Sequence, residues 1–532
     1  MEPVRLPVLS EVIADWARKA PGLVILTIDV GKGRADETRT YRQLWDNSRR
    51  LARALLDRGM RPGEHFAVLM ANHVEFVEAM VAACLTSTVF VPIDARTRGD
   101  KLLFMLDHAE CRGVIAADYS LGNLGEVRAS LPRLKWVIGL ATAAGPGAWP
   151  AWANRYEDAL PAGVPDPTSP AATPSSMMQL LFTSGTTGDP KGIMTSHGRW
   201  MENALIVPKL CGWQLDEKPY SGLSLTHANA QVLTLGACLV NGVPCVLSTR
   251  FTKTRLWDIA RRHHCTTFNL LGGMTTALYS EPRRPDDADN PVRFVLSAGM
   301  PAAIWEEFER RFNVRILEFY GAAEGGMAFK PIGVGPIGSI GKPVPSLSYR
   351  IVDEHGKDVL RGEPGELLFR PADGSPWVVE YFKDPEASAK KCDGGWLHMG
   401  DIVREDENGW LYFLYRKGGG IRRNGDFVNP AFVEKAIAEF DGVDDVYVYG
   451  MPAASGAPGD KDIVAAVVPA DPQHFDVPAL ASHCRARLEA NAVPGYIQLL
   501  EAIPKTASEK PQERFLLELF EHNPGSVYVT GS

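Results

Sequence analysis

The segment from Thr183 to Gly192 combines residue types that suit the binding of a phosphate group. It reads Thr-Ser-Gly-Thr-Thr-Gly-Asp-Pro-Lys-Gly and follows an apolar run, Leu180 to Phe182, that predicts the end of a buried strand. Glycines let a backbone wrap closely around a bulky anion, and amides and hydroxyls donate to its oxygens. Lys191 adds a point charge suited to phosphate. The segment differs from the Walker pattern, because the residue after the lysine is Gly192 rather than Ser or Thr.

A second segment, residues 318–325, reads Glu-Phe-Tyr-Gly-Ala-Ala-Glu-Gly and follows a predicted strand at Val314 to Leu317. In open α/β sheets, ligands bind at the carboxyl ends of the strands. Tyr320 offers a ring that stacks on a base, and Glu324 offers a carboxylate, the kind of ligand that Mg²⁺ prefers. A turn with one exposed acid is the alternative interpretation, and the phosphate segment upstream favours the nucleotide one.

The order Thr-Ser-Gly-Thr-Thr-Gly-x-Pro-Lys-Gly resembles the phosphate loop of the adenylate-forming superfamily, which comprises acyl-CoA synthetases, peptide-synthetase adenylation domains and luciferases. The resemblance extends over essentially the whole chain, and among branches it is nearest to carnitine/crotonobetaine-CoA-ligase-like enzymes and natural-product acyl-CoA ligases. It implies that the phosphates are bound by the residues of this loop: Thr183, Ser184, Gly185, Thr186, Thr187, Gly188 and Lys191.

The same resemblance implies sites for adenine and ribose. Residues 318–324 are similar to the Tyr-Gly-x-Thr-Glu motif, with Ala323 in place of the threonine that contacts the α-phosphate. Residues 396–401 are similar to Gly-Trp-x-x-Thr-Gly-Asp, with Met399 in place of threonine. The residues expected to bind the nucleoside are Ala298, Gly299, Glu318, Phe319, Tyr320, Gly321 and Ala323 near the base, and Asp401 and Arg416 at the ribose.

Three residues are expected to take part in catalysis: Lys510, Glu324 as the Mg²⁺ ligand, and His227. Lys510 ends a segment that begins Pro504-Lys505-Thr506 and resembles Pro-Lys-Thr-x-x-x-Lys, whose last lysine reaches the active site during adenylation. A carboxylate that attacks the α-phosphorus builds up negative charge, and a positioned cation stabilises that transition state. A solvated lysine near the end of the chain is the alternative interpretation of Lys510.

Five residues are assigned to the acid substrate. His227 lies in Leu-Thr-His-Ala-Asn, which resembles the family segment near the substrate carboxylate, and the segment lacks the Phe-Asp start used for amino acids. Paired glycines leave room, which favours a bulky alicyclic, terpenoid or steroid-like acid. The residues predicted to line this pocket are His227, Gly272, Gly273, Gly325 and Met327.

The segment 417–420, Lys-Gly-Gly-Gly, is a predicted hinge, and Gly418 stands where the family has Asp or Lys. The residues after it depart from the family pattern at Asn424, Asp426 and Phe427. The resemblance implies ATP and Mg²⁺ as cofactors and coenzyme A as acceptor. The departures leave two alternatives open: transfer to a carrier-protein phosphopantetheine, or a catalytically weak nucleotide-binding protein.

The elements that must position these residues predict an α/β fold. Strands and helices alternate over residues 39–92, as in a doubly wound sheet, and residues 340–416 have the short, turn-rich pattern of a small β-rich subdomain. Beyond the hinge, helices and strands predict a small, mobile α+β domain. The expected division is therefore an adenylate-forming domain at 1–416, a glycine hinge at 417–420 and a C-terminal domain at 421–532.

Composition bounds the class of protein. A chain of 532 residues exceeds the size of one domain, and a net charge of −8 without a basic stripe argues against a nucleic-acid partner. Its 8 scattered cysteines predict reduced thiols. The start of the chain lacks the apolar run of a signal peptide, and no run is apolar enough for a membrane span, so a cytoplasmic location is expected. A homodimer is common in the resembled family, and no residue pattern here indicates one.

Overall fold

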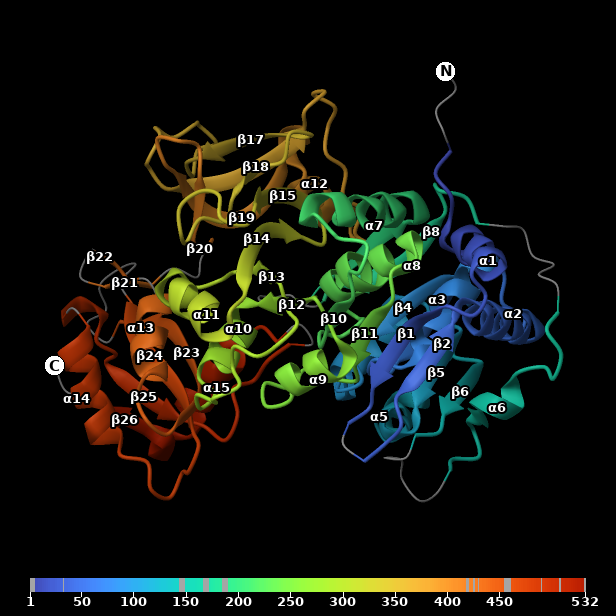
Figure 1. Cartoon of the computed structure of the whole chain (residues 1–532), viewed down its shortest axis with the longest axis horizontal. Helices are drawn as coiled ribbons and strands as arrows, with labels where there is room; N and C mark the ends of the chain where they lie inside the picture. Colours follow the sequence, from blue (N-terminus) through green and yellow to red (C-terminus); the bar gives the residue numbers. More distant parts are fainter. Residues whose placement is uncertain are drawn as a thin grey trace. The chain divides into compact units, whose positions relative to one another are not determined.

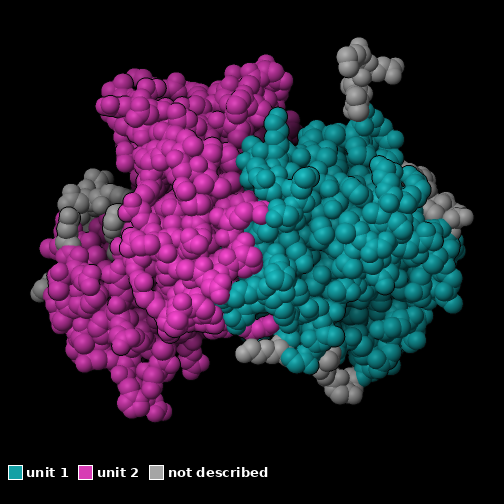
Figure 2. Space-filling view, viewed as in Figure 1, with its two compact units in different colours: residues 1–252, 258–269, 380–388 teal, residues 253–257, 270–379, 389–532 magenta. Residues whose placement is uncertain are grey.

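The computed structural model describes residues 5–31, 33–142, 149–165, 172–183, 190–417, 421–423, 426–428, 430–453, 461–488, 490–506 and 509–530. The chain divides into two compact units, drawn in two colours in Figure 2. Unit 1 comprises residues 1–252, 258–269 and 380–388, and unit 2 comprises residues 253–257, 270–379 and 389–532.

Unit 1 contains a sheet in the order β7-β6-β5-β3-β4-β8-β9, parallel except for the last pair. Its central strands are buried along their whole length and apolar except at His65, as expected of a parallel sheet covered on both faces. The strands are β3 (His65–Leu69), β4 (Val89–Ile93), β5 (Gly113–Ala117), β6 (Trp136–Leu140), β7 (Asn154–Arg155), β8 (Met177–Phe182) and β9 (Gly192–Ser196).

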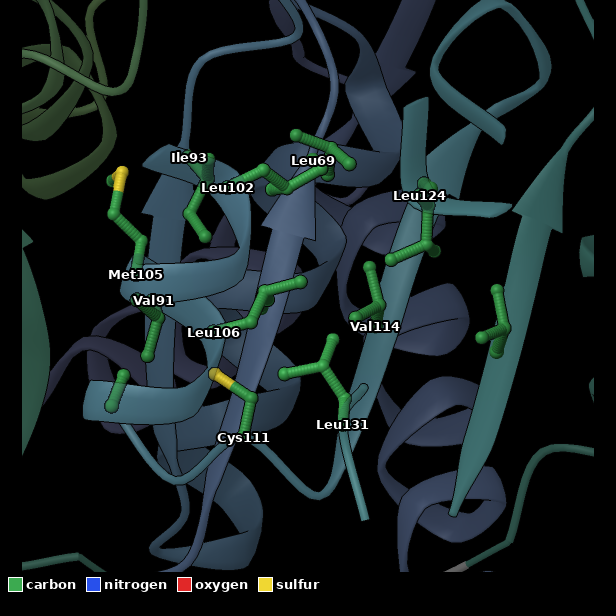
Figure 3. Close-up of a cluster of buried hydrophobic side chains, with 14 of the residues drawn as sticks. Leu69, Val91, Ile93, Leu102, Met105, Leu106, Cys111, Val114, Leu124 and Leu131 are labelled. Carbon is green, nitrogen blue, oxygen red and sulfur yellow. The ribbon is translucent and has the colours of Figure 1, made fainter. Parts of the chain in front are cut away.

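One face of this sheet is covered by α4 (Gly99–His108) and α5 (Asp118–Arg128). Figure 3 shows the buried cluster between them, in which leucines of both helices meet Leu69, Val91 and Val114 of the strands. The helix α3 (Val74–Thr86) contacts β4 and also strands of the next sheet, so it is buried along almost its whole length.

The second sheet of unit 1 has β10 (Pro219–Ser221), β11 (Cys245–Ser248) and β1 (Val24–Asp29) in parallel, with β2 (Glu37–Thr40) antiparallel at the edge. Strand β12 (Thr267–Leu271) pairs with β10, and the chain passes into unit 2 within it. The remaining helices up to this point are α1 (Leu9–Lys19), α2 (Tyr41–Asp57), α6 (Tyr156–Ala159), α7 (His197–Cys211), a π-helix (Asn229–Gly236), α8 (Ala237–Asn241) and α9 (Leu256–His263).

Unit 2 begins with strands in the order β16-β15-β14-β13 and continues into an antiparallel sheet, β17-β18-β19-β20 (Figure 1). The strands are β13 (Phe294–Ala298), β14 (Arg315–Ala322), β15 (Gly325–Lys330), β16 (Lys342–Pro343), β17 (Leu347–Val352), β18 (Gly365–Pro371), β19 (Leu397–Glu405) and β20 (Leu411–Arg416). The helices of this stretch are α10 (Gly272–Tyr279) and α11 (Trp305–Phe312), and α12 (Pro385–Lys391) begins in unit 1 and ends in unit 2.

The C-terminal part of unit 2 has a two-strand ribbon and a sheet in the order β23-β24-β25-β26. Its own apolar core joins α13 and α14 to β23 and β24. The elements are β21 (Ile421–Arg423), β22 (Asp426–Val428), α13 (Pro430–Ala438), β23 (Val443–Pro452), β24 (Lys461–Pro469), α14 (Val477–Arg487), β25 (Tyr496–Leu499), α15 (Glu513–His522) and β26 (Val527–Val529).

The predicted fold class is confirmed: doubly wound sheets come first, an antiparallel β subdomain follows, and a small α+β region ends the chain. The domain limits 1–416, 417–420 and 421–532 stay a prediction, and residues 418–420 of the hinge lie outside the described residues. All the cysteines are free thiols. Within the described part of the chain, every helix is too short or too polar to cross a lipid bilayer.

Candidate active site

Asp401 and Arg416, the predicted ribose residues, are a cross-strand pair. They lie directly opposite each other on β19 and β20, and Arg416 Nε is 3.0 Å from Asp401 Oδ1. Asp401 is only 4% exposed, whereas the Arg416 side chain is 56% exposed. The turn between the two strands therefore explains why these residues are far apart in sequence and adjacent in space.

Tyr320 joins this pair from β14. Its hydroxyl donates a hydrogen bond to Asp401 Oδ2. Burial raises the pKa of Tyr320, and the neighbouring carboxylate of Asp401 raises it further, so the hydroxyl stays protonated and donates. Unit 2 thus brings together three of the residues predicted for the nucleoside.

Glu318 fixes the segment predicted to contact adenine. Its Oε1 accepts hydrogen bonds from the amides of Gly299 at 2.6 Å and Met300 at 3.2 Å. Burial raises the pKa of Glu318 to about 8, against the opposing effect of these amides. Gly299, which follows Ala298 at the end of β13, has a φ of 95°, a conformation that requires glycine.

The strand that carries these residues is longer than predicted. Residues 318–322 were expected to follow a strand that ends at Leu317, but β14 continues to Ala322 and turns directly into antiparallel β15. Pairing with β15 keeps the backbone extended, because β15 supplies hydrogen-bond partners for residues 318–322. The sequence pattern alone does not indicate this pairing. Phe319 consequently lies opposite Phe329, and Gly321 opposite Met327.

Glu324, the predicted metal ligand, lies in the turn between β14 and β15 with Ala323 before it, and both are half-buried. The indole N–H of Trp377 donates to the Glu324 carbonyl oxygen at 3.2 Å. Gly325 has a φ of 119°, and a Cβ atom there would lie 2.1 Å from the Trp377 ring. Trp377 therefore positions the backbone of Glu324. The sequence alone does not indicate this role, because the motif around Glu324 contains no tryptophan and Trp377 lies some fifty residues downstream in the chain.

Lys510 lies at the end of a hairpin in the C-terminal part of unit 2. The Thr506 amide donates to the Lys510 carbonyl oxygen at 2.8 Å, and the Lys510 amide donates to Thr506 Oγ1 at 3.2 Å. The side chain keeps contact with solvent. Loss of hydration around the ammonium group lowers the pKa of Lys510, and the charge of Arg416 lowers it further. The charges of Asp401 and Glu324 act in the opposite direction. Unit 2 thus gathers Lys510, Glu324 and the ribose pair in one region.

The ends of the predicted phosphate loop are described in unit 1. The Thr183 amide donates to the Lys191 carbonyl oxygen at 2.9 Å, as β8 and β9 pair and bring the two ends together. Lys191 Nζ lies 5.4 Å from the centre of the Tyr381 ring and 4.0 Å from Asp384 Oδ2, and its side chain is half-exposed. Ser184, Gly185, Thr186, Thr187 and Gly188 lie outside the described residues.

His227 is half-buried in unit 1, just before the π-helix. The amide of Asn229 donates to His227 Nδ1 at 3.2 Å, so a neutral ring carries its proton on Nε2. Short π-helical segments occur frequently at functional sites. His227 thus has a defined tautomer, which a lone histidine in the sequence did not reveal.

The glycines predicted to open an acyl pocket contact protein atoms instead. A Cβ atom on Gly272 would lie 3.0 Å from the Gly299 carbonyl oxygen, and one on Gly273 would lie 3.2 Å from that of Glu509. Gly325 faces Trp377 as described above, and Met327 is half-buried. These contacts give the glycines a packing role, and their assignment to an acyl pocket stays a prediction.

Two family models match the chain. The model described as AMP-binding enzyme matches residues 13–375, and that of the AMP-binding enzyme C-terminal domain matches residues 433–510. The chain belongs to the AMP-binding enzyme family. The predicted membership of the adenylate-forming superfamily is thereby confirmed, as is the prediction of an enzyme of the AMP-forming acyl-CoA synthetase type.

Known proteins of this family resemble the chain over most of its length. The medium/long-chain-fatty-acid–CoA ligase FadD6 of Mycobacterium tuberculosis is 29% identical over 505 residues, which cover 90% of this chain and 81% of that protein. The anthranilate CoA ligase AuaEII, solved with anthranoyl-AMP, is 21% identical with a TM-score of 0.84 over 98% of this chain and 99% of its own. A benzoate CoA ligase from Burkholderia xenovorans LB400 is 23% identical with a TM-score of 0.79 over 96% and 100% of the two chains. The two solved structures share the fold of this AMP-binding enzyme.

Proposed function

We propose that this AMP-binding enzyme activates a carboxylic acid with ATP and transfers the acyl group to coenzyme A. In the first half-reaction a carboxylate oxygen attacks the α-phosphorus, and pyrophosphate leaves. In the second, the thiol sulfur attacks the carbonyl carbon of the acyl-adenylate, and AMP leaves with the former carboxylate oxygen. The observation that carries the proposal is the Asp401–Arg416 pair with Tyr320 bound to it and Lys510 alongside.

The residues of unit 2 are suited to the nucleotide roles. Asp401 accepts from the ribose hydroxyls, and Arg416 holds that carboxylate in place at 3.0 Å. Tyr320 stacks on adenine beside the Gly299 turn that Glu318 fixes. The Lys510 ammonium neutralises charge that develops on the α-phosphate. For unit 1 the proposed roles are binding of the departing phosphates by residues 183–191 and contact with the acyl group by His227.

Glu324 fits the predicted role of Mg²⁺ ligand. In nucleotide sites Mg²⁺ takes one or two protein carboxylates and completes its shell with phosphate oxygens and water. Glu324 supplies one such carboxylate from a turn whose backbone Trp377 holds at 3.2 Å. Glu324 would hold the cation there, and the cation would supply positive charge that neutralises the phosphates.

For the acid we propose a large apolar acyl group. Relatives named medium/long-chain-fatty-acid–CoA ligases support this size class, as they match 85% to 90% of the chain. An alicyclic or terpenoid-like acid is also large and apolar, and it is bulkier than a linear fatty acid. A panel of decanoate, cyclohexanecarboxylate and cholate, with phenylalanine as the amino-acid control, separates chain from ring.

The test measures the two half-reactions separately. Acid-dependent exchange of labelled pyrophosphate into ATP reports adenylation, and loss of free thiol reports transfer to coenzyme A. We expect exchange with at least one apolar acid, none with phenylalanine, and transfer to free coenzyme A faster than to a holo carrier protein. Absence of exchange with every acid would contradict the proposed activity, and transfer only to the carrier would replace coenzyme A as the acceptor.

A further inference from the structure

The hairpin that carries Lys510 lies against the first turn of α10. A Cβ atom on Gly273 would lie 3.2 Å from the carbonyl oxygen of Glu509 and 3.9 Å from Cδ of Pro511. These two residues are the direct neighbours of Lys510 in the chain. A side chain on residue 273 would therefore meet the Glu509 carbonyl oxygen and the Pro511 ring, on either side of the proposed catalytic lysine.

The contacted backbone has little freedom to move away. The Thr506 amide donates to the Lys510 carbonyl oxygen, and the Gln512 amide to that of Pro504, both at 2.8 Å. Between these bonds Glu509 adopts a φ of 58°, a left-handed conformation that only a tight turn imposes on such a residue. The hairpin thus holds the Glu509 carbonyl in place, and a Cβ atom on residue 273 would require this carbonyl to shift by a few tenths of an ångström.

A second contact fixes the C-terminal part of unit 2 near the other end of α10. Lys253 Nζ lies 2.6 Å from Asp444 Oδ1 and 3.3 Å from Oε1 of Glu281, which follows α10 in the chain. The adjacent Asp445 forms an ion pair with Lys505 at the base of the Lys510 hairpin. The C-terminal part of unit 2 therefore contacts the rest of the unit at two places, Lys253 and Gly273.

A glycine in this position needs an explanation. Glycine is among the least favourable residues in a helix, and the backbone at Gly273 does not have the positive φ that would require it. The close approach of the Glu509 carbonyl supplies the reason, because every other residue would place an atom there.

We propose that Gly273 is a positioning residue for Lys510: its missing side chain lets the hairpin seat on α10 and sets the position of the ammonium group. The inference rests on the proposed function, in which Lys510 serves the first half-reaction. A side chain at position 273 keeps the hairpin away from α10, so adenylation slows. Transfer to coenzyme A does not use Lys510 and continues.

The experiment compares Gly273→Ala and Gly273→Val with Gly122→Val as the matched control. Gly122 is also a glycine within a helix, α5, but a Cβ atom there meets nothing within 4 Å. Pyrophosphate exchange with decanoate or cyclohexanecarboxylate, whichever the wild type activates faster, reports adenylation. Thiol consumption from the synthetic adenylate of the same acid reports the second half-reaction.

We expect Gly273→Val to slow adenylation about 100-fold, since a displacement of about 1 Å at a reacting group has an effect of this order. Gly273→Ala is expected to slow it by about 5-fold, because the smaller side chain asks for a smaller displacement. The second half-reaction and both reactions of Gly122→Val stay within about twofold of the wild type. Equal loss of both half-reactions in Gly273→Val, or loss of neither, overturns the proposal.

A second measurement requires no acid substrate. Hydrogen exchange followed by mass spectrometry compares peptides that cover residues 272–279 and 504–512 in the wild type and Gly273→Val. Faster exchange of both peptides in the variant supports the contact, and unchanged exchange overturns it. If the wild type activates none of the acids, the proposed function fails, while hydrogen exchange still decides whether Gly273 seats the hairpin.

Discussion

Asp401 and Lys510 are both proposed to contact the same nucleotide, yet the chain holds them in different ways. Asp401 lies in a sheet, where strand register places it opposite Arg416 and the Tyr320 hydroxyl completes its contacts. Lys510 lies on a hairpin that depends on the contact with Gly273 and on an ion pair at Lys253. The residue that we propose serves both half-reactions is thus built into a sheet, and the residue that we propose serves only adenylation lies on a hairpin that packs against α10.

Replacing Lys510 by Ala is expected to have the largest effect on adenylation. The loss of one positioned cation at a developing charge lowers the rate by about 10²–10³-fold. Consumption of a synthetic acyl-adenylate by coenzyme A should stay near the wild-type rate, and an exposed lysine on α7, Lys209→Ala, serves as the control. Equal loss in the two half-reactions would show that Lys510, like Asp401, serves both of them.

Asp401→Asn tests the other side of the comparison. The variant removes the carboxylate charge that we propose accepts from the ribose, and it replaces the ion pair with Arg416 at 3.0 Å by a contact to a neutral amide. Hydrogen bonds to a charged group contribute about 1.5–3 kcal/mol each, so we expect kcat/KM for ATP to fall about 100-fold. Because the adenylate carries the same ribose, the second half-reaction should fall as well. A defect confined to adenylation would contradict the view that this pair serves both steps.

Lys253→Met is expected to have a smaller effect that follows the docked hairpin. It removes the ion pairs to Asp444 at 2.6 Å and Glu281 at 3.3 Å, which are partly exposed, so adenylation should slow only about 5-fold. Rising salt concentration should also slow wild-type adenylation, because it screens these ion pairs. Arg250→Met, in an exposed position a few residues upstream, is the control. A salt response in Lys253→Met as large as in the wild type would show that another pair fixes this region.

The sequence predicted what depends on local pattern. The predicted alternation of strands and helices over residues 39–92 matches α2, β3, α3 and β4, because apolar runs and turn residues mark these elements directly. The motif order also located Asp401 and Arg416, and the register of β19 and β20 explains their spacing. These features depend on residues that are near one another in the chain or linked by one hairpin.

The sequence could not predict contacts between distant segments. Trp377 holds Glu324 from a loop between β18 and α12, and the Glu509 carbonyl fills the space beside Gly273. A glycine pair in a sequence has the same appearance whether a substrate or another part of the chain fills the space beside it. For that reason the sequence alone does not distinguish a glycine that opens an acyl pocket from one against which another segment packs, as the Glu509 carbonyl does at Gly273.

Glu318→Gln is expected to change how stability depends on pH. Burial raises the pKa of Glu318 to about 8, so the folded state binds this proton more tightly than the unfolded state, where the value is near 4.5. Its contribution to the free energy of unfolding therefore falls as pH rises between about 4.5 and 8, by up to about 1.4 kcal/mol per pH unit. Denaturant unfolding at pH 5, 6, 7 and 8 should show a flatter profile for the variant. If the free energy of unfolding depends on pH equally in the variant and the wild type, Glu318 is ionised in the folded state. The amide of Gly299 would then donate to a carboxylate rather than to a protonated carboxyl group.

Glu509→Gly is expected to have the smallest effect and to separate backbone from side chain in the docked hairpin. Glu509 has a φ of 58°, which glycine adopts without the steric cost of a Cβ atom. Relief of that strain contributes about 1–2 kcal/mol, and the greater freedom of glycine in the unfolded chain costs about 0.4–1 kcal/mol, so the free energy of unfolding should rise by about 0.5–1 kcal/mol in denaturant titrations. Asn313→Gly, at a φ of 52° after α11, is the matched control for a change at a left-handed residue away from the hairpin. Because Gly273 contacts the carbonyl oxygen of residue 509 rather than its side chain, adenylation should stay within about twofold of the wild type. A clear loss of adenylation in Glu509→Gly alone would show that the glutamate side chain positions Lys510, and the backbone contact would then be insufficient to hold the hairpin.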